Sequence, residues 1–357
     1  MPKRLVALPR TEGMQFDIVS YGRRGPGVPW HFSPAQVDQI QRTVRRVPEV
    51  MVKVSGGGRD AGGVLAHLKY IDRHGKLPIE TDDGRAMEGR DAAEAVATDW
   101  NLDLLSSHHR PKPVQGQKDT RSKLVHNIVL SMPDQTPPDA VLAAAKRFAR
   151  ENFALQYRYA MVLHTDQAHP HVHLVVKAEH EFEPRKRLHI RKATLRSWRE
   201  QFAACLREEG VAANATPRPQ RGQLEPAKKD PIHHRLRAMV AFRKLSEQDR
   251  TRTSRRPPVE SSFMRRKVEA IGKELQSGRL EGESGKQRMA STRDKVVGDW
   301  AATAASLRRQ GLSALAQEVE RFVQGMPTVQ TEKERIARGM VELLAKGRLP
   351  PERSRDD

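Results

Sequence analysis

The residues with the clearest chemical potential are four histidines and one aspartate in the ten-residue segment His164-Thr-Asp-Gln-Ala-His-Pro-His-Val-His173. His171 and His173 are separated by one residue, and in a strand this spacing directs both side chains to the same face. The residues before and after the segment, 159–164 and 174–176, are apolar and typical of strands. A tight turn at His169-Pro170 would place His164 beside the other two imidazoles.

Three converging imidazoles form a metal site with an open coordination position, which is typical of catalytic sites. The chain has a single cysteine, Cys205, so no thiolate set completes a closed structural site. Isolated surface histidines are common, but this density favours a metal site. We therefore predict that His164, His171 and His173 are metal ligands, with Asp166 on the same face of its strand as His164.

The charge of the chain indicates a polyanionic partner. Its formal net charge is +20 and its pI is about 10.4. We expect nucleic acid rather than a membrane, because no stretch has the length and hydrophobicity of a membrane span. Because only 5% of the residues are aromatic, an extensive base-stacking platform is not expected. One cysteine and no secretory signal suit the cytoplasm.

The chain divides by composition into an N-terminal arm (1–48), a domain of alternating strands and helices (49–225) and a basic, mainly helical region (226–357). The segment 213–230, rich in Pro, Lys and Arg, is interpreted as a linker, and the tail from Lys346 as disordered. The patterns predict strands at 50–54, 123–131, 159–164 and 171–176, and helices from Pro34 and over 63–73, 138–153 and 193–209.

A second chemical feature lies on the helix predicted over 63–73. Its apolar stripe contains Val64, Leu65, Leu68 and Ile71, and Tyr70 lies off this stripe. Helical spacing places His67 and His74 on the face of Tyr70. Positive charge from Lys69 and Arg73 would favour a phenolate, which attacks phosphorus to form phosphotyrosine. The alternative is a half-buried tyrosine with a structural hydroxyl.

Several motifs together resemble conjugative relaxases and mobilisation nucleases of the HUH endonuclease superfamily, in particular the T-DNA border-nicking branch. They are the Gly56-Gly-Gly58 turn, the phrase Leu68-Lys-Tyr-Ile-Asp-Arg-His-Gly-Lys-Leu77, the strand ending at Ser131, and the histidine segment. The resemblance spans about residues 50–222. It implies that Tyr70 is the nucleophile and that His164, His171 and His173 bind a divalent metal, Mg²⁺ or Mn²⁺. It also implies that Asp166 orients the first histidine or handles protons, and that Ser131 helps to position DNA.

The resemblance implies an α+β fold with a central antiparallel sheet and flanking helices, followed by the basic helical region. It also implies a site- and strand-specific relaxase that forms a 5′-phosphotyrosine link at a transfer origin. The expected partners are single-stranded and duplex DNA, a relaxosome accessory protein and a type IV coupling protein, with export to a recipient cell on the DNA. The alternatives are a rolling-circle replication or transposition nickase, and a non-catalytic metal-containing DNA-binding accessory protein.

The order of the residues separates the first alternative from a relaxase. Rolling-circle enzymes of this superfamily place the tyrosine after the histidines, whereas all four tyrosines of this chain, Tyr21, Tyr70, Tyr157 and Tyr159, precede His171. Strand alternation directs Tyr157 and Tyr159 away from the face of His164. Tyr21 lies in the arm, so Tyr70 is the best candidate.

Overall fold

The computed structural model describes residues 31–102, 119–183, 185–224, 262–278, 280, 282–283 and 285–345. The chain forms two compact units, one of residues 34–216 and one of residues 1–33 and 217–357. Most of the predicted arm, the last third of the predicted linker (225–230) and the tail from Lys346 lie outside the described residues. The two units are described separately below.

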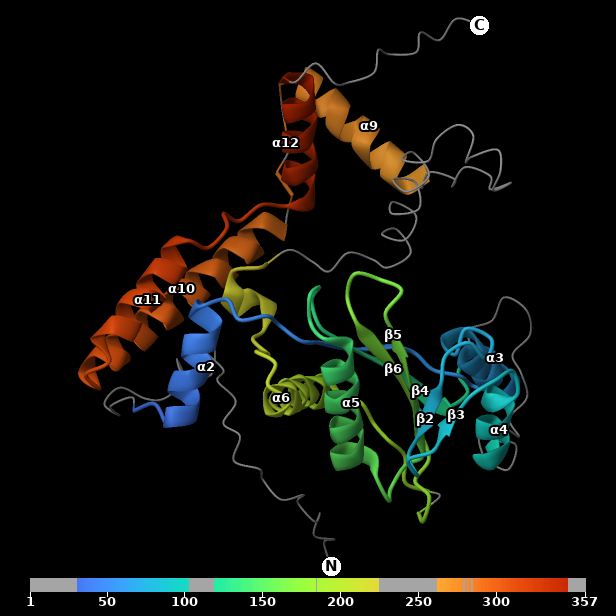
Figure 1. The fold of residues 1–357 in the computed structure, drawn as a ribbon. Coiled ribbons are helices and arrows are strands. Elements are labelled where there is room, and N and C mark those ends of the chain that lie inside the picture. Colours follow the sequence, from blue (N-terminus) through green and yellow to red (C-terminus); the bar gives the residue numbers. More distant parts are fainter. Residues whose placement is uncertain are drawn as a thin grey trace, which may run out of the picture. The chain divides into compact units, whose positions relative to one another are not determined.

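The first unit is built on a six-stranded sheet with the strand order β1-β4-β6-β5-β2-β3, in which all neighbours are antiparallel (Figure 1). The strands are β1 (Met51–Gly56), β2 (Ile79–Thr81), β3 (Ala86–Met87), β4 (Val125–Ser131), β5 (Tyr159–His164) and β6 (His171–Lys177). The strands β4, β6 and β5 occupy the middle of the sheet, so they are shielded from solvent on both faces and rich in β-branched and apolar residues.

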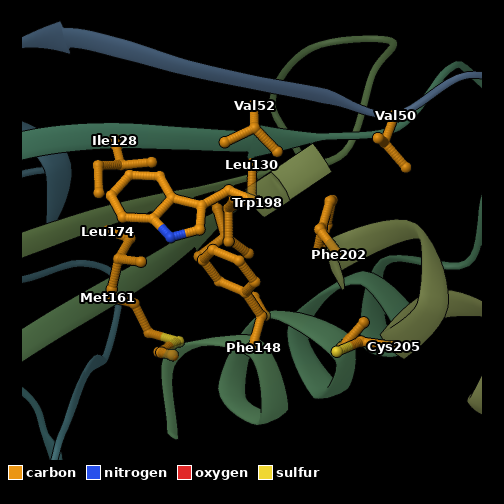
Figure 2. Close-up of a cluster of buried hydrophobic side chains, with 14 of the residues drawn as sticks. Val50, Val52, Ile128, Leu130, Phe148, Met161, Leu174, Trp198, Phe202 and Cys205 are labelled. Carbon is orange, nitrogen blue, oxygen red and sulfur yellow. The ribbon is translucent and has the colours of Figure 1, made fainter. Parts of the chain in front are cut away.

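One face of the sheet packs against helices α5 (Pro138–Phe153) and α6 (Lys192–Glu208). Alternate strand residues such as Ile128, Leu130 and Leu174 meet aromatic side chains of the helices there. Figure 2 shows Trp198 and Phe202 of α6 and Phe148 of α5 between the strands and the helices. The ring centroids of Phe148 and Trp198 lie 6.1 Å apart at an edge-to-face angle of 90°, which is a favoured aromatic geometry.

The opposite face of the sheet carries the helices α3 (Ala61–Ile71) and α4 (Ala92–Asp99). The predicted stripe of α3 is confirmed, since Val64, Leu68 and Ile71 are fully buried against this face and Leu65 packs at its margin. Because residues alternate along a strand, the face that receives α3 also receives the side chains of β6 at odd positions. This alternation places the histidines of β6 on the side of the sheet that α3 covers.

Helix α2 (Pro34–Val44) belongs to the first unit and begins at the proline that follows Ser33, as the sequence predicts. Its Thr43 hydroxyl is 2.8 Å from that of Thr216, and the Asn214 amide donates to the hydroxyls of both threonines. Asn214 is 1% exposed, and its backbone forms a parallel bridge with Glu49. The interpretation of 213–230 as a linker is therefore wrong for residues 213–216, which close the first unit.

The described part of the second unit is helical. It contains α9 (Ser262–Gln276), α10 (Gly285–Arg309), α11 (Ser313–Gln324), α12 (Glu332–Ala345) and the short 3-10 helix η2 (Arg218–Arg221). Helices α10 and α11 pair through Trp300 and Phe322, whose ring centroids lie 5.3 Å apart. Trp300 is fully buried and donates from its indole nitrogen to the carbonyl of Gln220. Residues 218–222 are therefore also packed rather than linker-like.

The architecture confirms the predicted fold class, an α+β unit with a central antiparallel sheet and flanking helices followed by a helical region. The predicted helices and long strands lie within about two residues of their observed bounds, whereas β2, β3 and α4 are additional. Among the described residues, no helix is both long enough and apolar enough to cross a membrane.

Candidate metal centre and nucleophile

The three predicted ligands converge on one face of the β5–β6 hairpin. The register pairs His164 with His171, and His173 lies two residues further along β6, on the same face. The ring centroid of His164 lies 5.1 Å from that of His171 and 4.5 Å from that of His173. The centroids of His171 and His173 are 5.2 Å apart. One ring nitrogen from each histidine lies within 4.8 Å of the others. This is the arrangement of a three-imidazole metal site.

Backbone carbonyls set the tautomers of two of these histidines. Nε2 of His164 lies 2.6 Å from the carbonyl of Ile71, and Nδ1 of His171 lies 3.0 Å from the carbonyl of His169. A carbonyl only accepts, so each of these nitrogens carries the proton, and the lone pair is on the other nitrogen. A hydrogen bond of this kind from the second ring nitrogen is typical of metal-ligating histidines. The third histidine, His173, has a buried Nδ1 that finds no hydrogen-bond partner in the described part of the chain.

The surroundings of His164 and His173 favour their neutral form. Burial lowers the pKa of His173 to about 3, and repulsion from a charge on His164 or His171 acts in the same direction. Burial also lowers the pKa of His164, against the hydrogen bond to Ile71. Since a metal binds the neutral imidazole, these shifts prepare the nitrogens as ligands at neutral pH. The donor set thus fits a divalent cation.

Tyr70 is presented to solvent next to this cluster. Helix α3 starts at the N-cap Asp60, whose carboxylate accepts from the backbone of Gly63 at 2.8 Å. Tyr70, near the C-terminal end of α3, is 58% exposed. The ring of His67 stacks with that of Tyr70 at a centroid distance of 6.3 Å and meets the edge of the His173 ring at 6.4 Å. His67 thus connects the tyrosine to the metal ligands.

The other residue expected on the face of Tyr70, His74, does not extend the helix. Helix α3 ends at Ile71, and both Arg73 (φ 56°) and His74 (φ 57°) have left-handed backbones. The expected grouping of His74 with Tyr70 by helical spacing is therefore wrong. The chain reverses at this point, which turns Arg73 back toward the histidines.

Arg73 is the site residue that helical spacing did not identify. Its Nη2 lies 2.6 Å from Oδ2 of Asp166 and 3.2 Å from Nδ1 of His164. Its guanidinium carbon also lies 5.3 Å from the centroid of the Tyr70 ring. One cation therefore contacts the nucleophile candidate, a metal ligand and the acidic residue. A tyrosine with an arginine three residues later is a weak sequence signal. The left-handed turn at Arg73 and His74 is what directs the arginine to the histidines.

Asp166 and Ser131 lie at the site in different ways. Asp166 is 4.0 Å from Nδ1 of His164, so its direct hydrogen bond goes to Arg73 instead. Desolvation opposes the charge of Asp166, but the bond from Arg73 outweighs it and lowers the pKa of the carboxyl. Ser131 pairs with His171 in the β4–β6 ladder and is 4% exposed, and its hydroxyl makes a long contact of 3.4 Å to the carbonyl of Met132.

The remaining tyrosines are unsuited to attack on a substrate. Tyr157 and Tyr159 are 8% and 5% exposed and belong to the core on the α5–α6 face. Burial raises the pKa of both phenols. Tyr21 lies outside the described residues. Tyr70 is thus the tyrosine of the described chain that combines exposure with proximity to the histidines.

Comparisons with known proteins find relaxases in sequence and in fold. Residues 86–211 match the family described as relaxase, MobA/VirD2-like, nuclease domain. The matched range includes Ser131, Asp166 and the three histidine ligands and begins after Tyr70. Among solved structures, the MobM relaxase domain bound to oriT DNA is similar with a TM-score of 0.35 and 13% identity, and covers 54% of this chain and 99% of that chain. The conjugative relaxase TrwC in complex with oriT DNA has a TM-score of 0.30 and 12% identity, and the match covers 74% of this chain and 99% of that chain.

Curated relatives extend the comparison in sequence. The T-DNA border endonuclease VirD2 of Rhizobium radiobacter is 26% identical over 217 residues, which are 57% of this chain and 48% of that protein. VirD2 of Agrobacterium fabrum is 25% identical over 200 residues, which are 53% of this chain and 42% of that protein. The chain spans about half the length of these relatives or less. The resemblance seen in the sequence is thus confirmed, and residues 86–211 of this chain match the MobA/VirD2-like relaxase nuclease family.

Proposed function

We propose that this protein is a relaxase that nicks and rejoins one DNA strand at a transfer origin, to start conjugative or mobilisation transfer. The observation that carries the proposal is the position of Tyr70, which is exposed and lies next to His67, whose ring meets that of His173 in the histidine cluster. An accessible phenol beside a cation site suits attack on a phosphodiester. The VirD2 relatives, described as T-DNA border endonucleases, support the same reaction class.

In the proposed reaction the Tyr70 hydroxyl oxygen attacks the scissile phosphorus. The bond from phosphorus to the 3′ oxygen breaks as the bond to tyrosine forms. The phenol loses its proton to a nearby base or water, and the departing oxygen takes up a proton to become a 3′-hydroxyl. The product is a 5′-phosphotyrosine. Because one phosphodiester replaces another, the step is reversible, and a 3′-hydroxyl can attack the link to rejoin the strand.

The residues around Tyr70 have distinct roles in this proposal. His164, His171 and His173 would hold a divalent cation, Mg²⁺ or Mn²⁺, which when bound neutralises charge on the scissile phosphate. Arg73 orients the Tyr70 ring and carries positive charge at the position of the phosphate. Asp166 holds Arg73 in place at 2.6 Å. Ser131 lies opposite His171 in the β4–β6 ladder and supports that strand end, since its hydroxyl is buried.

The DNA at the nick must be single-stranded or extruded from the duplex, because a phosphate within intact duplex does not fit against a sheet surface. The net charge of +20 supports phosphate contacts beyond the site. We further propose that the protein acts in the cytoplasm, with a relaxosome accessory protein and a type IV coupling protein as partners, and that it is exported to a recipient cell while bound to DNA. The basic helical region is the candidate surface for these partners.

The test is the formation of a covalent adduct. The full chain is incubated with Mn²⁺ and end-labelled oligonucleotides that tile the DNA flanking its gene, and the products are separated in SDS. A labelled protein band that depends on Mn²⁺, maps to one phosphodiester and appears with a 3′-end label but not with a 5′-end label supports the proposal, because the tyrosine is joined to the 5′ phosphate of the downstream fragment. The absence of an adduct with all oligonucleotides, despite their binding, would support the non-catalytic accessory protein instead.

A further inference from the structure

Both ring nitrogens of His164 are already engaged in the structure. Nε2 donates to the carbonyl of Ile71 at 2.6 Å, which leaves Nδ1 as the nitrogen with the lone pair. The guanidinium of Arg73, through Nη2, lies 3.2 Å from that Nδ1. An arginine has no acceptor, so it donates to this lone pair. The side chain of His164 is 1% exposed, and water therefore does not compete for the nitrogen.

A metal ion needs the same lone pair. A histidine ligand places its nitrogen about 2.0–2.1 Å from a metal such as zinc, along the axis of the lone pair. An imidazole nitrogen has a single lone pair, so a guanidinium N–H and a metal cannot share it. A divalent ion at the centre of the three rings would also repel the guanidinium, because both are cationic in a poorly solvated position. Arg73 and the cation are therefore mutually exclusive at Nδ1 of His164.

We propose that Arg73 occupies the cation position of His164 in the metal-free protein and that metal binding displaces it toward the phosphate attacked by Tyr70. Arg73 is then a positioning residue whose location reports whether the metal site is loaded. The second half of this inference rests on the proposed function, because it places a phosphate beside Tyr70. The first half, the exchange at His164, depends only on the histidine cluster and Arg73.

The surroundings of Arg73 allow this exchange. Asp166 is 53% exposed and holds the guanidinium from the side that faces solvent, so the bond at 2.6 Å can persist when the contact to His164 breaks. The centroid of the Tyr70 ring lies 5.3 Å from the guanidinium carbon, so the guanidinium stays in contact with the nucleophile candidate as it moves. Because the Arg73 side chain is 29% exposed, it moves without opening the core. A guanidinium released there meets a phosphate in bidentate geometry.

The exchange is tested by calorimetric titration of MnCl2 into the full chain without DNA. Arg73→Asn is the variant of choice, since asparagine tolerates the left-handed backbone at this position (φ 56°). It should bind Mn²⁺ about tenfold more tightly than the wild type, because a charge-assisted hydrogen bond no longer has to break. Arg85→Asn is the matched control, because Arg85 also pairs with an aspartate, Asp83, but lies in the β2–β3 turn. It should leave the affinity within twofold.

A second measurement keeps the inference testable if Arg73→Asn folds poorly. In the wild type, addition of the diamagnetic ion Zn²⁺ should shift the NMR resonances of the Arg73 guanidinium and leave those of Arg85 unchanged. Equal Mn²⁺ affinity of Arg73→Asn and wild type, or an unmoved Arg73 resonance on saturation with Zn²⁺, would overturn the exchange and leave the nicking proposal intact. No binding of either ion to wild type and both variants would overturn the metal site itself, and the exchange with it.

Discussion

The ring of His67 stacks on that of Tyr70 one turn further along α3, and its Nε2 is buried without a hydrogen-bond partner among the described residues. Burial lowers the pKa of His67, so the ring is neutral near pH 7. The neutral ring of His67 therefore lies between the Tyr70 ring and that of His173, so Tyr70 is next to the histidine cluster while its own ring stays exposed.

Replacement of Tyr70 by phenylalanine should abolish the covalent adduct and leave DNA binding within about twofold, because only the attacking oxygen is removed. The adduct is measured in SDS gels and binding by fluorescence anisotropy with the same oligonucleotide. Tyr157→Phe is the control, since its phenol is buried on the other side of the sheet, and it should keep the adduct. An adduct formed by Tyr70→Phe would move the nucleophile to another tyrosine.

Replacement of His171 and His173 together by alanine should remove metal binding and cleavage while the sheet remains folded. Two of the three candidate imidazole ligands are lost, and their positions on the sheet become apolar. Calorimetry with Mn²⁺ gives the stoichiometry, and far-UV circular dichroism gives the fold. The exposed His189 provides a control, and His189→Ala should bind one ion like the wild type. Unchanged stoichiometry in the double variant would refute the ligand assignment.

The metal-free protein should lose stability as the pH falls below about 6.5. Burial lowers the pKa of His126 to about 4 despite its hydrogen bond to the carbonyl of Leu188. In the unfolded chain this imidazole has a pKa of about 6.5, so the unfolded state binds more protons between these values. The stabilising contribution is full above about pH 6.5 and decreases toward pH 4, by up to about 1.4 kcal/mol per pH unit.

Urea denaturation in EDTA at pH 7.5, 6.0 and 5.0 measures this dependence. His126→Gln should reduce the slope without removing it, because the substituted residue takes up no proton in the unfolded state while His164 and His173 still do. A variant with the same slope as the wild type would show that other histidines, such as those of the metal cluster, dominate the dependence.

A fragment of residues 34–216 should fold and cut single-stranded oligonucleotides that carry the target site. This range holds the whole sheet, helix α2, the Asn214 and Thr216 contacts, and every candidate catalytic residue. Cleavage of supercoiled duplex should drop, because the basic helices beyond it no longer add phosphate contacts. The chain cut at residue 212, before Asn214, is the informative comparison. It should melt at a lower temperature, and equal stability of both fragments would contradict this boundary.

The affinity of the full chain for DNA should decrease steeply with salt. A net charge of +20 suits a protein that neutralises several phosphates and so releases counterions on binding. Anisotropy titrations between 50 and 200 mM NaCl measure the slope of log K against log salt. The fragment 34–216 should show a smaller slope than the full chain. A flat dependence would mean that the basic surface does not contact DNA.

The elements with long periodic patterns could be predicted from the sequence. Helix α5 and strand β5 have the expected bounds, and the His164–His171–His173 cluster forms on the hairpin as the alternation implied. Strands of two or three residues, such as β3 (Ala86–Met87), contain too few positions for a periodic signal. These short strands form because the edge of β5 offers a pairing partner, which is a long-range effect.

The errors at the site have a similar origin. Composition marked residues 213–216 as a linker, but Asn214 is buried through contacts with Thr43 and Glu49, far away in sequence. Helical spacing grouped His74 with Tyr70, but the backbone turned left-handed at Arg73 instead. The same turn created the contacts of Arg73 with Asp166 across 93 residues of chain. Neither the burial of Asn214 nor the left-handed turn at Arg73 can be predicted from the residues next to it in sequence.

The three ligands all lie in one hairpin, Tyr159 to Lys177, whereas Tyr70 and Arg73 reach it only when distant parts of the sheet assemble. Hairpins form by short loop closure, and contacts between distant segments form more slowly. During synthesis, the hairpin also leaves the ribosome after α3, and it must receive that helix on its face. We therefore expect the three histidines to come together early in folding, whereas Tyr70, Arg73 and the Ile71 carbonyl that bonds His164 reach them only when α3 docks.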